Sequence, residues 1–122
     1  MPNPASSGNS GPSVPAVDAA EAQHQAEAGT CLLDVREADE WEAGHASSAT
    51  WIPMGEVAAR AVELPTDVPI AVICRSGARS ATVTQALRQA GYDAVNVQGG
   101  MKSWAAAGFS VVTSAGEPGI VA

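Results

Sequence analysis

The fold is decided by one stretch of the sequence, Ile70-Ala-Val-Ile-Cys-Arg-Ser-Gly-Ala-Arg-Ser80, together with the segment that follows it. Ile70 to Ile73 is the most continuous apolar run of strand length in the chain. Its residues do not alternate with polar ones, which is typical of a strand covered on both faces in a parallel sheet. From Ser80 to Ala90, apolar residues recur at i, i+3, i+4 and i+7, which predicts an amphipathic helix. The stretch therefore reads as a strand, a short loop and a helix.

The same alternation continues on both sides of this unit. Helices are expected at Asp18 to Gly29, as a turn within Arg36 to Ala46 that ends near Gly44, at Gly55 to Val62 and at Met101 to Ala107. Further strands are expected at Cys31 to Val35, Thr50 to Ile52 and Ala94 to Val97. Strands and helices in alternation predict an α/β fold with a mainly parallel central β-sheet flanked by helices on both faces.

Length and composition set the domain organisation. A chain of 122 residues makes one domain. We place that domain at residues 14–112, between a leader at 1–13 and a Gly- and Pro-containing tail at 113–122 whose role is left open. The leader is rich in Pro, Ser, Asn and Gly and lacks the charged and apolar regions of a secretory signal, so it is expected to be flexible. Two cysteines are too few for a disulfide scaffold, and a cytoplasmic location is expected.

Charge excludes several classes of function. The net charge is −7, which argues against binding to nucleic acid or to acidic membranes. No apolar run approaches the ~20 residues of a membrane-spanning helix. Two histidines and no paired-cysteine spacing leave no basis for a metal site. Two of the six basic residues, Arg75 and Arg79, nevertheless lie close to Cys74, and this local reversal of charge marks the loop as a candidate site.

The Cys74 loop has the features of an activated nucleophile. Backbone N–H groups at a strand-loop-helix junction favour the thiolate form of cysteine, and Gly77 permits the tight turn. Arg75 and Arg79 are expected to lower the thiol pKa further and to hold an anionic substrate. The plainer interpretation, that Cys74 is a small buried apolar residue at a strand end, stays open.

Other candidate residues lie at the strand ends. Asp34 and Arg36 follow a strand on the same sheet edge as the Cys74 loop, where they border the site or, as we favour, form a structural ion pair. His45 is expected to be a structural histidine rather than a general base. Cys31 begins its strand whereas Cys74 follows the end of its own, so the two are predicted to lie too far apart for a disulfide.

Three segments carry a family resemblance. The loop from Cys74 to Ser80 resembles the active-site loop of rhodanese-like (rhodanese-homology) domains, a six-residue cradle opened by the catalytic cysteine. Leu32-Leu-Asp-Val-Arg-Glu37, with Glu40-Trp41 and Gly44-His45, is similar to the family's N-terminal signature. Gly91-Tyr92, Val97-Gln-Gly-Gly100, Trp104 and Gly108 are similar to its C-terminal one. One departure is Ala46-Ser-Ser-Ala49, where members usually have Ile-Pro-Gly-Ala, and this link is expected to be softer.

The resemblance implies a single-domain thiosulfate sulfurtransferase that needs neither a metal nor an organic cofactor. Cys74 would be the catalytic nucleophile. It would take the outer sulfur of thiosulfate or a similar small anionic donor as a persulfide and pass it to cyanide or to a thiol acceptor, including a protein thiol. The implied substrate-binding residues are Arg75, Ser76, Gly77, Ala78, Arg79 and Ser80: their amides would cradle the persulfide, and the two arginines would hold the sulfonate end of the donor.

Two rival functions stay in view. Cysteine phosphatases and arsenate reductases resemble Cys-x5-Arg, but position 80 is Ser here and the arginine falls one residue earlier, so the shorter loop fits a sulfur atom better. The other rival is a sulfur-relay carrier or a regulatory binding module fed by a protein partner. The intact nucleophile loop favours an enzyme over that alternative.

Overall fold

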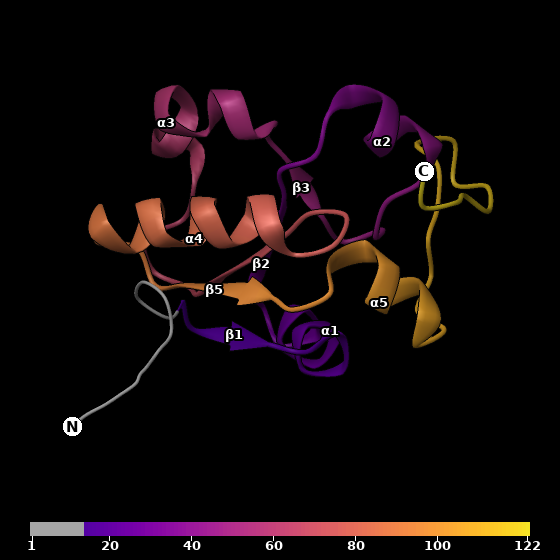
Figure 1. The fold of residues 1–122 in the computed structure, drawn as a ribbon, viewed down its shortest axis with the longest axis horizontal. Helices are drawn as coiled ribbons and strands as arrows, with labels where there is room; N and C mark the ends of the chain where they lie inside the picture. Colours follow the sequence, from indigo (N-terminus) through magenta and orange to yellow (C-terminus); the bar gives the residue numbers. More distant parts are fainter. Residues whose placement is uncertain (1–13) are drawn as a thin grey trace.

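The central sheet has five strands, all parallel, in the order β1-β5-β4-β2-β3 (Figure 1). The computed structural model describes residues 14–122, so the expected leader at 1–13 lies outside the described residues. The strands are β1 (Ala16–Val17), β2 (Cys31–Asp34), β3 (Thr50–Trp51), β4 (Ile70–Ile73) and β5 (Ala94–Val97). The predicted fold class is confirmed. Only β1 was missed, because the sequence analysis found no apolar run of strand length at Ala16–Val17.

The helices are α1 (Ala19–Glu27), α2 (Ala38–Ala43), α3 (Val57–Arg60), α4 (Ala78–Gln89) and α5 (Gly100–Ala106). The first helix begins where it was expected, and Asp18 caps it, since its side chain accepts a hydrogen bond of 2.8 Å from the Glu21 amide. The helix expected from Gly55 to Val62 is shorter than predicted. Two 3-10 turns, η1 (Met54–Glu56) and η2 (Ala61–Glu63), flank α3, and Gly55 at the start has little helical propensity.

Each face of the sheet carries its own apolar core. In β4, Ile70 and Val72 pack into a cluster with residues of α3 and α4, whereas Ala71 and Ile73 pack into a second cluster with residues of α1 and α5. All four side chains are 0% exposed. The continuous apolar run predicted a strand covered on both faces, and the structure confirms it.

A buried ion pair joins the end of β2 to the end of α2. Asp34 and Arg36 both have side chains that are 0% exposed, and Arg36 Nη2 lies 2.7 Å from Asp34 Oδ2. Arg36 Nε donates to Asp34 Oδ1 at 2.9 Å, and Nη2 also donates to the Gly44 carbonyl at 2.8 Å. All the charged groups of the pair therefore have protein partners, as the structural interpretation of these residues requires.

We expect Arg36→Met to lower the free energy of unfolding by about 3–5 kcal/mol, because Asp34 would remain buried without its cation. Denaturant unfolding at neutral pH measures this. The matched control is the double variant Asp34→Asn/Arg36→Met, which leaves no buried charge and should recover part of the loss. Equal losses in the two variants would contradict an ion-pair origin for the effect.

Candidate active site

Cys74 follows β4 directly and opens the loop into α4, at the edge of the sheet where the parallel strands end. Its side chain lies in the apolar cluster beneath α4 and is only 1% exposed. Gly77 has φ of +107°, a left-handed conformation that favours glycine, and serves as the N-cap of α4. The turn at Gly77 brings the start of α4 back over the sulfur. Cys74 is therefore buried, as the plainer interpretation expected. Its side chain is also held in position by the loop, which that interpretation does not explain.

Three hydrogen-bond donors converge on the Cys74 sulfur. Cys74 Sγ accepts from the Gly77 amide at 3.1 Å, from the Ser80 amide at 3.3 Å and from Ser80 Oγ at 3.2 Å. The two amides belong to the start of α4, where helices leave backbone N–H groups without intrahelical partners. The sulfur thus takes the place of a helix-capping oxygen and lies at the positive end of the helix dipole.

The pKa of the Cys74 thiol is lowered by these donors. Burial acts in the opposite direction and raises the pKa, but it is more than offset by the Ser80 hydroxyl and by the amides of Ser80, Gly77 and Ser76. Cys31 provides the contrast, since burial raises the pKa of its thiol and a hydrogen bond with Thr50 only partly offsets it. Cys74 is the more readily ionised of the two cysteines.

The amino-terminal end of α5 supports the back of the loop. The Met101 amide donates to the Cys74 carbonyl at 2.8 Å, and the Lys102 amide donates to the Arg75 carbonyl at 3.0 Å. Gly100 makes this approach possible, because a Cβ there would lie 2.4 Å from the Cys74 carbonyl oxygen. The sequence analysis assigned these residues only to the C-terminal signature. Their support of the cysteine loop emerges from the tertiary structure.

Asn96 is a second contributor that the sequence analysis missed. Its Nδ2 donates to the Gly77 carbonyl at 3.2 Å and so helps to fix the turn of the loop. Its Oδ1 is buried and has no hydrogen-bond partner among residues 14–122. The sequence did contain a sign of this contact, because Asn96 is a polar residue within the apolar strand Ala94–Val97. Buried polar groups need a hydrogen-bond partner.

The two arginines of the loop have different environments. Arg79 Nη1 and Nη2 donate to the two carboxylate oxygens of Glu40 at 2.7 and 2.8 Å, a bidentate ion pair. Hydrogen bonding by Arg79 lowers the pKa of Glu40 to about 2, so the pair is charged at neutral pH. Arg75 is exposed, and its Nε donates to the main-chain oxygen of Ala122 at 2.8 Å. The sequence analysis placed both arginines in the loop but did not predict that Glu40 and Ala122 bind them.

Two further candidate residues, His45 and Cys31, lie outside the cysteine loop. His45 stacks on Trp41 with ring centroids 3.5 Å apart, and its Nδ1 donates to the Trp41 carbonyl at 2.7 Å. Cys31 pairs with Ile70 at the start of β4, whereas Cys74 follows the end of that strand, so the predicted separation is confirmed and both cysteines are free. Between residues 14 and 122, no group of three or more His, Cys, Asp or Glu side chains is placed to hold a metal ion.

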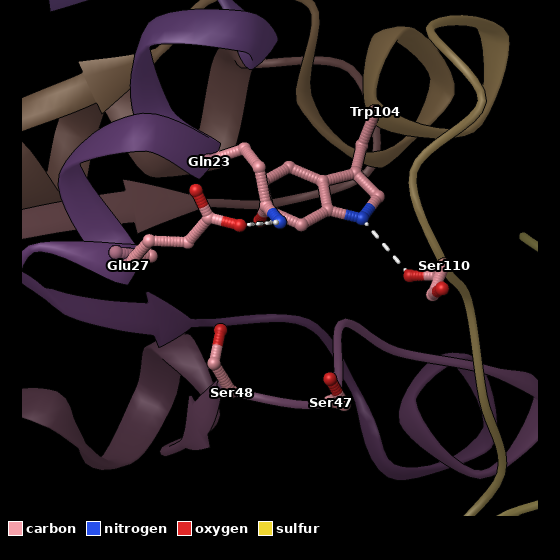
Figure 2. A pocket seen from close by; sticks show the side chains of 7 residues that line it. Gln23, Glu27, Ser47, Ser48, Trp104 and Ser110 are labelled. Carbon is pink, nitrogen blue, oxygen red and sulfur yellow. Dashed lines mark hydrogen bonds between the residues drawn. The ribbon is translucent and has the colours of Figure 1, made fainter.

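A separate polar hollow of about 270 Å³ lies away from the Cys74 loop (Figure 2). Trp104 and Ser110 line it together with Gln23 and Glu27 of α1 and the link residues 47–48. Trp104 Nε1 already donates to the Ser110 carbonyl at 3.1 Å, and the Gln23 amide donates to Glu27 at 3.3 Å. Among the described residues that line it, none is a cysteine or a histidine. Within the described part of the chain, no helix is long and apolar enough to cross a membrane.

Comparisons with known proteins agree with this geometry. The family model described as "Rhodanese-like domain" matches residues 17–107. The chain is 42% identical over 74 residues to the putative sulfur carrier protein YrkF of Bacillus subtilis (strain 168), covering 60% of this chain and 40% of that protein. It is 37% identical over 86 residues to a sulfurtransferase of Allochromatium vinosum, covering 70% of this chain and 80% of that protein. The crystal structure of a rhodanese-related protein from Thermoplasma volcanium superposes with a TM-score of 0.76 at 36% identity, covering 80% of this chain and 97% of that one.

We expect Ser80→Ala to raise the pKa of Cys74, because the Ser80 hydroxyl is the largest of the contributions that offset burial. The thiolate fraction at neutral pH then falls. The pH dependence of alkylation by iodoacetamide measures this in a Cys31→Ala background, where Cys74 is the only thiol. Ser76→Ala is the matched control and should leave the pKa unchanged, since alanine keeps the Ser76 amide. Equal pKa values for parent and Ser80→Ala would refute the hydroxyl's role.

Proposed function

Because this chain belongs to the rhodanese-like domain family, we propose that it is a sulfurtransferase that carries sulfane sulfur as a persulfide on Cys74. The observation that carries this proposal is the buried Cys74 sulfur with donors at 3.1, 3.3 and 3.2 Å. A thiol stabilised in this way ionises more readily than an ordinary cysteine, and the thiolate is the nucleophilic form. It is also a good leaving group when the sulfur is passed on.

The proposed cycle has two displacement steps and no net redox change. The Cys74 thiolate attacks the outer sulfur of thiosulfate, a sulfur-sulfur bond forms on Sγ, and the sulfur-sulfur bond of the donor breaks with its electron pair leaving on sulfite. Cyanide or a thiolate then attacks the outer sulfur of the persulfide. The bond to Sγ breaks and returns the electron pair to the Cys74 thiolate. Neither step requires a general base, which agrees with a structural role for His45.

The loop residues have separate roles in this cycle. The amides from Arg75 to Ser80 hold the persulfide in this proposal, and those of Gly77 and Ser80 already donate to the Cys74 sulfur at the start of α4. Arg75 binds the oxyanion end of the donor through Nη1 and Nη2, for which the described residues provide no hydrogen-bond partner. We assign Arg79 a weaker part in donor binding than Arg75, since both its Nη atoms pair with Glu40.

A sulfur-relay role is the second candidate, and the similarity to the putative sulfur carrier YrkF favours it. In that role, a protein persulfide loads Cys74 and a protein thiol unloads it. Since Cys74 is 1% exposed, such a partner would have to present its sulfur on a narrow, protruding segment. The two candidates share the persulfide and differ in the donor that forms it.

We expect the reduced protein to gain one sulfur atom after incubation with thiosulfate and desalting, and Cys74→Ser to gain none. Intact-mass measurement shows the gain, and thiocyanate release on addition of cyanide shows that it is transferable. Cys31→Ala is the control and should still load, since Cys31 lies at the other end of the sheet. A folded parent that loads from a protein persulfide and not from thiosulfate would favour the relay. A parent that loads from neither would refute the persulfide itself.

We expect Arg75→Gln to raise KM for thiosulfate about tenfold, because one charge-assisted hydrogen-bonding group to the donor is lost. The matched control is Glu40→Gln/Arg79→Gln, which removes the other arginine together with its partner and leaves no unpaired charge. Steady-state kinetics with thiosulfate and cyanide compare the two. A rise in KM as large in the double variant as in Arg75→Gln would contradict the separate roles assigned to the arginines.

A further inference from the structure

The segment that follows α5 folds back along the domain instead of leaving it. Antiparallel bridges pair Val112 with both His45 and Pro118. The Gly119 amide then donates to the Val111 carbonyl at 2.8 Å. In Figure 1 the yellow end of the chain lies beside α2. The role of residues 113–122 was open at the level of sequence, and these contacts place the segment beside the end of α2.

The last residues are anchored on the end of α2 by a close backbone contact. The Ile120 amide donates to the Ala43 carbonyl at 2.9 Å. A Cβ at Gly44 would lie 2.5 Å from the Ile120 carbonyl oxygen, and a Cβ at Gly119 would lie 2.8 Å from the Ala43 carbonyl oxygen. Backbone thus meets backbone at a separation that only glycine allows at these two positions. The α2 end is itself fixed, since Arg36 binds the Gly44 carbonyl.

From this anchor the chain reaches Arg75. The main-chain oxygen of Ala122 accepts a hydrogen bond of 2.8 Å from Arg75 Nε. An exposed arginine otherwise samples many rotamers, and immobilising it on binding a ligand carries an entropic cost. A contact at Nε removes much of that freedom before the ligand arrives. It also leaves both Nη atoms, the ends of the guanidinium fork, to face an anion.

We propose that the strap, residues 119–122, positions Arg75 for binding of the anionic sulfur donor. The inference rests on the proposed function and extends it: Ala122 is a positioning residue whose main-chain oxygen acts through the Arg75 guanidinium. The strap does not compete with the donor, because it uses Nε and the donor uses the Nη atoms. Because the strap is anchored on the end of α2, its contact with Arg75 restricts the movement of the Arg75 side chain.

The first test is Gly119→Ala, which forces the strap away from α2 without altering any residue of the cysteine loop. We expect KM for thiosulfate to rise about three- to tenfold, which corresponds to the immobilisation of one flexible side chain on binding, while kcat stays within twofold. In a Cys31→Ala background the rate of Cys74 alkylation by iodoacetamide, an uncharged reagent, should not change, since no anion is bound. Gly55→Ala is the matched control, because a Cβ at Gly55 meets no atom within 4 Å.

A second variant, a chain ending at Ile120, removes the Ala122 oxygen and keeps both glycines, and it should show the same rise in KM. In an Arg75→Gln background neither change should raise KM further. Equal effects in the two backgrounds would show a merely structural role for the strap and overturn the proposal. A fall in KM would overturn it in favour of an inhibitory contact.

A readout without activity separates this proposal from the proposed function. The Nε–H proton of a held arginine exchanges slowly with water and gives a resolved NMR signal. We expect that signal for Arg75 in the parent and in Gly55→Ala, and its loss in Gly119→Ala. If the parent forms no persulfide but shows this pattern, the proposed function fails and the positioning of Arg75 stands. A parent without the signal would overturn the positioning, whatever its activity.

Discussion

The site depends on one hydrogen-bonding constraint. When a loop turns its N–H groups inward onto a sulfur atom, its carbonyls point away and need donors of their own. The amides of Met101 and Lys102 at the start of α5 supply them, at 2.8 and 3.0 Å from the carbonyl oxygens of Cys74 and Arg75. A helix start has unpaired amides to give, so each segment satisfies the other. Gly100 is the residue that lets the two backbones meet, which gives the glycine pair of the C-terminal signature a physical reason.

Dipoles, more than full charges, stabilise the thiolate. The lowered pKa of Cys74 arises from one hydroxyl and three amides acting against the effect of burial. Arg79, one of the two arginines of the loop, pairs with Glu40. This division suits a chain of net charge −7. Fixed dipoles hold a negative sulfur in place with no added charge, and one arginine at the mouth of the site is left to bind the anion under the proposed function.

Two sets of interactions connect α2 to the cysteine loop. Glu40 within the helix binds Arg79, and the backbone at its end anchors the strap that reaches Arg75. The helix is positioned in turn by the buried pair of Asp34 and Arg36. The first signature of the sequence is therefore connected to the cysteine loop through hydrogen bonds and ion pairs, although the hydrogen-bond donors to the Cys74 sulfur come from Gly77 and Ser80.

The sequence by itself determined the α/β fold, four of the five strands, the helix that follows Cys74 and the cysteine loop as the candidate site. These are local matters: apolar runs, helical periodicity, an Asp18 cap and a glycine turn act over a few residues, and each can be read within its own window. The tertiary structure alone decided which groups face one another. Glu40 meets Arg79 across 39 positions, and Ala122 meets Arg75 across 47, so no local pattern records them. The partners of the two arginines, the support from α5 and the path of the C-terminal strap follow from how the strands are ordered in the sheet.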